Sequence, residues 1–116
     1  MATNALTYIP GKKITFVLIH GAWHGAWCWK KVIPLLEAKG NRVLAPDLPG
    51  HGKDKTPVAT VTLDDYVKKV VEVAKAQTGP VILVGHSMAG VVVVQAAELL
   101  GKEKIAKIVF LDAFMP

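Results

Sequence analysis

Four short runs of branched aliphatic residues alternate with three longer segments of helical character, and this alternation constrains the fold more than any other feature. The four runs are Ile14 to Ile19, Val43 to Ala45, Val81 to Val84 and Lys107 to Leu111. The first run is apolar almost throughout, as expected for a parallel strand that is covered on both faces. Parallel strands joined by helices cross over right-handedly, and four strands cannot close a barrel. The pattern therefore predicts one α/β domain over residues 1–116, with an open, doubly wound parallel sheet and three helices.

Turn and capping residues delimit the three predicted helices. The first spans about residues 27–36, where Pro34 should either kink the helix or mark its true start. Its tryptophans, and Trp23 just before it, either pack in the core or line a substrate pocket, and we expect the core. The second helix opens at a capping box at residues 62–65 and shows an apolar face at helical spacing. The third runs from about residue 88 to 100, before a glycine that ends it.

Composition and charge exclude several classes of protein. Hydrophobic residues make up 52% of the chain and charged residues 20%, which excludes intrinsic disorder. The longest apolar stretches fall far short of the roughly 18 residues of a membrane span, so no membrane partner is expected. The net charge of +5 comes from scattered lysines without a basic run, so no nucleic-acid partner is expected either.

The N-terminal segment and the cysteine content bear on location. Residues 1–9 lack the charged start and apolar run of a secretion signal, and the single Cys28 cannot form an internal disulfide. A reducing cytoplasm is therefore the expected location. Residues 1–13 form either a loose tail or a small edge strand.

The segment Gly-His-Ser-Met-Ala-Gly at residues 85–90 follows a predicted strand and opens a predicted helix. That context is typical of a nucleophile elbow, in which a strained turn presents the hydroxyl of Ser87 outward. The free amide of Met88 and the positive end of the helix dipole can then face an oxyanion that forms on a carbonyl bound at Ser87. A plain turn that caps the helix is the alternative, but the strand, turn and helix signals all agree with the elbow.

A second motif, His-Gly-Ala at residues 20–22, ends the first strand. Alone it would more often be a plain turn, but together with the elbow it favours the amide of Ala22 as the second oxyanion donor. Asp47, after the second strand, is expected to brace its loop. A catalytic base must reach the serine hydroxyl within about 3 Å, directly or through one water. We expect His86 to point away from the hydroxyl, and His20 to turn inward and support its loop.

Two further histidines and one acid remain as candidates for the rest of a catalytic triad. His24 lies in the loop nearest the predicted site, and His51 lies in a Pro-Gly-His-Gly turn after the second strand. Either is a possible base. Asp112 lies just past the fourth strand and is a possible acid, although an acid without its histidine orients nothing.

Together these motifs resemble the α/β-hydrolase superfamily, and residues 17–27 are similar to its methylesterase and hydroxynitrile lyase branch. Further matches lie at residues 34–37, 45–52 and 109–116, so the resemblance covers about residues 14–116. It implies the strand order second, first, third, fourth. It also implies that Ser87 is the nucleophile, that the amides of Ala22 and Met88 form the oxyanion hole, and that small carboxylic esters are hydrolysed without a metal or organic cofactor.

The chain departs from the family pattern at two points. Ala89 replaces the last glycine of Gly-x-Ser-x-Gly, which adds one methyl group. The family's acid and base histidine usually follow later strands, and this chain stops at Pro116, so the resemblance is to a truncated core, the N-terminal half of the fold. Loss of the histidine from a serine hydrolase costs on the order of a millionfold in rate. We therefore expect slow acylation of Ser87 and poor turnover.

Three functions stay open. The chain is a weak serine ester hydrolase, a catalytically incomplete unit for folding or assembly, or a lyase that cleaves C–C bonds. The lyase is less favoured because that branch usually has threonine where Gly21 stands. The apolar edge at Lys107 to Leu111 and the apolar third helix predict a homodimer or larger assembly. The expected partners are thus a small ester and a second copy, and the sequence does not identify the acyl or alcohol group of the ester.

Overall fold

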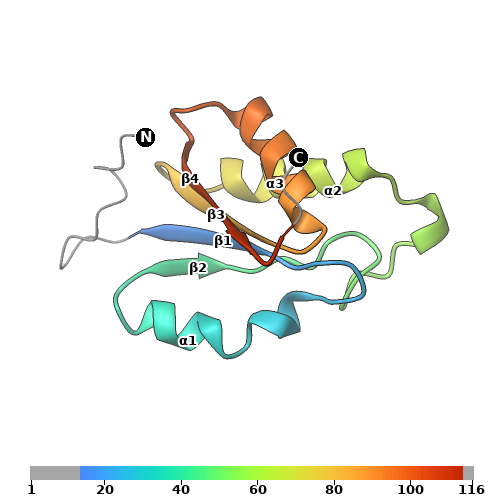
Figure 1. The fold of residues 1–116 in the computed structure, drawn as a ribbon, viewed down its shortest axis with the longest axis horizontal. Helices are drawn as coiled ribbons and strands as arrows, with labels where there is room; N and C mark the ends of the chain where they lie inside the picture. The colour runs from blue at the N-terminus through green and yellow to red at the C-terminus, as the bar shows by residue number, and fades with distance from the viewer. Residues whose placement is uncertain (1–13, 114–116) are drawn as a thin grey trace.

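The computed structural model describes residues 14–113, in which four parallel strands form one sheet in the order β2-β1-β3-β4 (Figure 1). The strands are β1 (Thr15–Ile19), β2 (Arg42–Leu44), β3 (Val81–His86) and β4 (Ile105–Leu111). The α-helices are α1 (Val32–Glu37), α2 (Leu63–Lys75) and α3 (Ala89–Leu100), and the short 3-10 helices are η2 (Ala26–Trp29) and η3 (Val58–Thr60). The predicted fold class and strand order are confirmed. The tail or edge strand expected within residues 1–13 lies outside the described residues.

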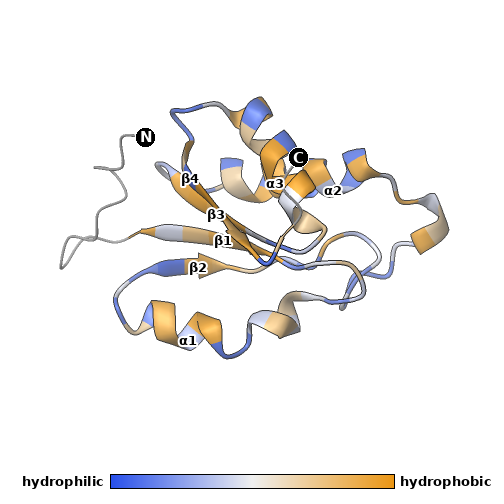
Figure 2. Cartoon of the chain, in the orientation of Figure 1, coloured by the Kyte–Doolittle hydropathy of each residue, from blue (hydrophilic) through white to orange (hydrophobic). Residues whose placement is uncertain are grey.

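Helices cover the two faces of the sheet, with α1 on one side and α2 and α3 on the other (Figure 1). Val17 and Ile19 are buried with Val93 of α3, whereas Leu18 between them is buried with Trp29 on the α1 side. Because successive side chains of a strand point to opposite faces, this division explains why residues 16–19 are all apolar. Figure 2 shows this hydrophobic character along β3, β4 and α3.

The helix ends follow the local sequence in two of the three predicted helices. At the start of α2, Thr62 accepts a hydrogen bond from the amide of Asp65, and the Asp65 carboxylate accepts one from the amide of Thr62, so the predicted capping box is confirmed. The third helix begins at Ala89, one residue later than predicted, and ends before Gly101. Within residues 14–113, no helix has both the length and the hydropathy of a bilayer span.

The first predicted helix is wrong as a single element. It is divided into η2 and α1, with a turn at residues 30–31 between them. Pro34 lies in the first turn of α1. Backbone N–H groups in the first turn have no carbonyl partner within the helix, so a proline, which lacks the N–H, is tolerated there. The position of Pro34 therefore fits a helix that starts close to it, which was one of the two expectations.

Candidate active site

Ser87 lies at a sharp corner between β3 and α3. The strand ends at His86 and the helix begins at Ala89, so two residues make the whole connection. Ser87 has a φ of 56°, in the left-handed region that residues other than glycine rarely adopt. Its carbonyl accepts a hydrogen bond from the amide of Gly90 at 3.0 Å. This backbone is what the predicted nucleophile elbow requires.

The residue before the corner explains how strand and helix come so close. A Cβ atom added at Gly85 would lie 2.9 Å from the carbonyl oxygen of Ala89 and 2.9 Å from a methyl carbon of Val93. Side-chain carbons essentially never approach other atoms so closely. The glycine therefore lets α3 pack directly on the end of β3, and this packing places Ser87 at the rim of the sheet.

The loop after β1 runs beside Ser87. In the sheet, Ile19 pairs with Gly85, so the residues that follow each strand end side by side. A Cβ atom at Gly21 would lie 2.9 Å from the Cβ of Ser87 and 3.1 Å from the carbonyl oxygen of His86. The structure therefore brings the His-Gly-Ala motif and the elbow together at one point.

Two backbone amides at this point have no acceptor among the described residues. The amide of Ala22 belongs to the loop beside Ser87, and the amide of Met88 belongs to the N-cap of α3. Neither donates a hydrogen bond within residues 14–113, and the Ser87 hydroxyl makes none there either. Free amides at a helix N-terminus carry a partial positive charge that stabilises an anion. The role of Ala22 and Met88 as oxyanion donors stays a prediction.

His20 supports the loops and is not a free base. Its side chain is 0% exposed, and its Nε2 accepts a hydrogen bond from the amide of Leu48 at 3.0 Å. Its Nδ1 must therefore carry the proton and donate to the carbonyl of Gly21 at 2.8 Å. Burial lowers the pKa of His20, because the charged imidazolium would lose its hydration. The inward, structural position predicted for His20 is confirmed.

His24 and His51 are each hydrogen-bonded through Nδ1 to a backbone carbonyl of their own loop. The Nδ1 atom of His24 lies 2.9 Å from the carbonyl oxygen of Ala22, and that of His51 lies 3.0 Å from the carbonyl oxygen of Pro49. A carbonyl only accepts, so Nδ1 carries the proton in both neutral rings and Nε2 is the basic nitrogen. Both residues line one small cavity of about 230 Å³ together with Trp23. Ser87 does not line this cavity, and within residues 14–113 it is hydrogen-bonded to neither ring.

The two other predicted site residues occupy separate positions. The ring of His86 packs edge-on against His24 and Trp29, with centroid separations of 5.8 and 6.4 Å, which agrees with the expected packing beside the sheet. His86 pairs with Leu111, so Asp112 follows β4 at the same sheet edge as Ser87 follows β3. Asp112 is exposed and makes no hydrogen bond within the described residues. Its role as the acid stays a prediction.

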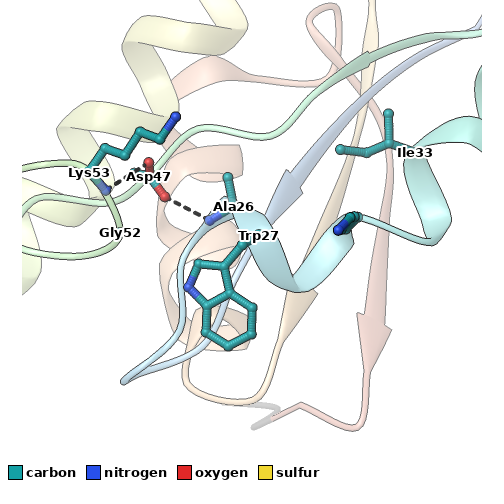
Figure 3. Close-up of a pocket in the computed structure, with 7 residues that line it drawn as sticks. Ala26, Trp27, Ile33, Asp47, Gly52 and Lys53 are labelled. Carbon is teal, nitrogen blue, oxygen red and sulfur yellow. Dashed lines mark hydrogen bonds between the residues drawn. The ribbon is translucent and has the colours of Figure 1, made fainter.

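Asp47 braces the loops at this edge, as predicted. Its carboxylate accepts a hydrogen bond from the amide of Ala26 at 2.7 Å and another from the amide of Lys53 at 3.2 Å (Figure 3). Over residues 14–113, no three His, Cys, Asp or Glu side chains are grouped so as to hold a metal ion.

The exposure of two tryptophans contradicts the expectation that they pack in the core. Trp29 is only 3% exposed, but Trp27 is 62% exposed and Trp23 is 89% exposed, so the prediction that all three pack in the core is wrong for two of them. Trp23 lies in the loop with a φ of 68°, and Trp27 and Trp29 lie two residues apart in η2. Residues two apart in a 3-10 helix point about 120° away from each other, so only one of them faces the sheet.

Comparison with known proteins gives consistent matches. The model of the Alpha/beta hydrolase family matches residues 16–116. The alpha-hydroxynitrile lyase of Arabidopsis thaliana is 44% identical over 108 residues, which are 90% of this chain and 42% of that protein. Methylesterase 9 of the same plant is 42% identical over 104 residues, covering 87% of this chain and 40% of that protein. The crystal structure of polyneuridine aldehyde esterase superposes with a TM-score of 0.85 at 38% identity, covering 90% of this chain and 42% of that one.

The chain thus spans about two fifths of the length of these relatives. Over that part, the similarity includes the loop after β1, the corner at Ser87 and the end of β4. The resemblance inferred from the motifs is confirmed, and the relatives include both esterases and a lyase. With a family model that matches residues 16–116, this chain belongs to the Alpha/beta hydrolase family.

Proposed function

We propose that this chain carries the nucleophile and oxyanion hole of a serine ester hydrolase that acts on small carboxylic esters. The observation that carries the proposal is the left-handed backbone of Ser87 directly beside Gly21. Strain of this kind persists only where the surrounding structure imposes it, and it clusters at functional sites. The esterases among the relatives support the same reaction class.

In the proposed reaction, the Ser87 oxygen attacks the ester carbonyl carbon while its proton passes to a base. The carbonyl oxygen becomes an oxyanion, and the amides of Ala22 and Met88 donate hydrogen bonds to it. Collapse of this tetrahedral intermediate breaks the bond to the alcohol oxygen, which leaves with a proton, and forms an acyl ester on Ser87. Water then attacks the acyl carbon and releases the acid.

The described residues favour acylation over turnover. Within residues 14–113, no histidine is hydrogen-bonded to Ser87 or to Asp112. Without a positioned base, the oxyanion hole and substrate binding still supply about a thousandfold over the reaction in water. We therefore expect this chain to react with activated acyl or phosphonyl groups and to release the product slowly.

A fluorophosphonate probe tests this proposal directly, because it phosphonylates activated serines with loss of fluoride. Ser87 is the only serine of the chain, so intact-mass analysis reads out one site. We expect a single adduct that disappears in Ser87→Ala. Thr60→Val, which removes an exposed hydroxyl elsewhere, is the matched control and should label as the wild type does. Equal labelling of Ser87→Ala would overturn the assignment.

Turnover separates the two remaining interpretations of the site. Steady hydrolysis of p-nitrophenyl acetate that is abolished in Ser87→Ala would indicate an enzyme whose base is His24, His51 or a group of a second chain. Labelling without turnover would indicate an incomplete catalytic unit for folding or assembly. His24→Gln and His51→Gln, made separately, identify the base if turnover is present.

A C–C lyase is the second candidate, and the similarity to a hydroxynitrile lyase favours it. Gly21 has no side chain, so the position beside Ser87 that is usually threonine in that branch provides no hydroxyl here. Release of cyanide from an aromatic cyanohydrin, dependent on Ser87, would support the lyase over the esterase.

A further inference from the structure

A second cavity, of about 610 Å³, lies between η2, α1 and the loop that follows β2 (Figure 3). Its lining residues are Ala26, Trp27, Lys30, Ile33, Asp47, Gly52 and Lys53. None of the residues of the elbow contributes to this lining, and neither does the loop segment at Gly21 and Ala22. The cavity is therefore distinct from the position where an ester would meet Ser87.

The apolar part of the cavity suits a flat hydrocarbon ring. Trp27 contributes an indole that is 62% exposed, although a large aromatic side chain is ordinarily buried. Ile33 from α1 and the methyl group of Ala26 are the other apolar side chains that line the cavity (Figure 3). An aromatic ligand gains from stacking on an indole as well as from removal of apolar surface from water.

The polar part of the cavity favours a negative charge. Lys30 and Lys53 both line it and are exposed, and within residues 14–113 neither forms an ion pair. Asp47 is the only acid in the lining, and its two carboxylate oxygens already accept hydrogen bonds from the amides of Ala26 and Lys53. The lining thus carries two positive charges against one negative charge, and its two ammonium groups have no ion-pair partner among the described residues.

The cavity walls are held in place before any ligand arrives. Gly52 has a φ of 55°, and a Cβ atom there would overlap the Asp47 carboxylate, so the loop packs tightly onto this acid. The same carboxylate holds the start of η2 through Ala26. Asp47 thus fixes the loop of Lys53 and the helix of Trp27 on opposite sides of one space, and such preorganisation lowers the entropy lost on binding.

We propose that this cavity binds an aryl carboxylate, with its ring on Trp27 and its carboxylate between Lys30 and Lys53. A ligand of this class matches both the apolar and the cationic residues of the lining, since one end of it is apolar and flat and the other carries a single delocalised negative charge. This binding is separate from the chemistry at Ser87 and does not depend on it.

Protein NMR with 1-naphthoate and its neutral isostere 1-naphthamide tests the proposal on this chain. We expect naphthoate to shift the indole N–H resonance of Trp27 and the amide resonance of Ala26 in a saturable manner. Naphthamide should bind about fivefold more weakly, because it lacks the charge that the lysines recognise. Lys30→Ala/Lys53→Ala should weaken naphthoate binding about fivefold and leave naphthamide binding unchanged.

Two control variants test whether binding is specific to this cavity. Lys31→Ala/Lys39→Ala removes two exposed lysines of the same segment that do not line the cavity, and it should bind naphthoate as the wild type does. Ser87→Ala should also bind normally, whether or not the proposed esterase activity exists. Equal affinity for the two ligands, unchanged binding by the Lys30/Lys53 double variant, or shifts centred on Ser87 would overturn the proposal.

Discussion

Gly85→Ala is the sharpest test of how the fold produces the corner at Ser87. The added methyl carbon would meet the carbonyl oxygen of Ala89 and a methyl carbon of Val93 at 2.9 Å, whereas ordinary contacts begin near 3.4 Å. The helix would therefore have to move by about 0.5 Å, the difference of these two distances. Such movement is resisted because Val92 and Val93 of α3 are fully buried in the core.

The expected loss of stability follows from two opposing effects. Overpacking of a well-packed region costs about 1–3 kcal/mol, and replacement of glycine by alanine returns about 0.4–1 kcal/mol by restricting the unfolded chain. The net loss in the free energy of unfolding is about 1–2 kcal/mol, which lowers the Tm by roughly 4–8 °C in a domain of this size. Because α3 carries the amide of Met88, its displacement should also slow fluorophosphonate labelling of Ser87, by about tenfold.

Thermal unfolding followed by circular dichroism, with labelling measured well below the Tm, checks both parts. Gly79→Ala is the matched control, because Gly79 has a φ of 77° with no atom within 4 Å of an added Cβ. That variant should lose about 1 kcal/mol through backbone strain alone and label at the rate of the wild type. If Gly85→Ala kept both the Tm and the labelling rate of the wild type, close packing of β3 and α3 would not be what holds Ser87 in place.

Two further predictions concern a buried histidine and the sheet edge. Burial lowers the pKa of His20 below 6.5, so as the pH falls from about 7 to 5 the unfolded chain takes up a proton that native His20 resists, and stability is lost. In urea unfolding at several pH values, His20→Gln should flatten this pH dependence. We also propose that the chain forms a homodimer through β4, which among the described residues pairs only with β3, and Leu111 of β4 is 47% exposed. Sedimentation should show a dimer at tens of micromolar that Leu111→Lys weakens and Leu35→Lys, on exposed α1, does not; a monomeric wild type would refute it.

The parts of the fold that could be predicted are those that short stretches of sequence determine. The capping box at Thr62 involves residues three apart, and the corner at Ser87 is set by small residues directly around it. The strand order came from the resemblance to a family, because local sequence does not determine which parallel strands become neighbours. The position of Asp112 beside the nucleophile edge follows from that order and from the register of β4.

The region around the tryptophans could not be predicted from spacing. The amide of Ala26 at the start of η2 donates to the carboxylate of Asp47, which lies 21 residues further along the chain. This tertiary contact accompanies a 3-10 turn where the apolar spacing favoured an α-helix, and it leaves Trp27 on the surface. In the sequence, the contact is indicated only by Asp47, an acid in a glycine-rich loop. Such an acid can be expected to brace its loop, but the sequence does not indicate that it also lines a cavity.

The histidines show why the site is proposed to acylate slowly and turn over poorly. A base for Ser87 needs a free nitrogen within about 3 Å of the hydroxyl. His20 uses both ring nitrogens to join the loops after β1 and β2. His24 and His51 keep Nε2 free, but their Nδ1 bonds fix each ring to its own loop, beside a cavity that Ser87 does not line. These hydrogen bonds to the backbone order the loops around the nucleophile, and they also hold the three rings away from the Ser87 hydroxyl. Deprotonation of Ser87 is therefore the step that the described side chains assist least.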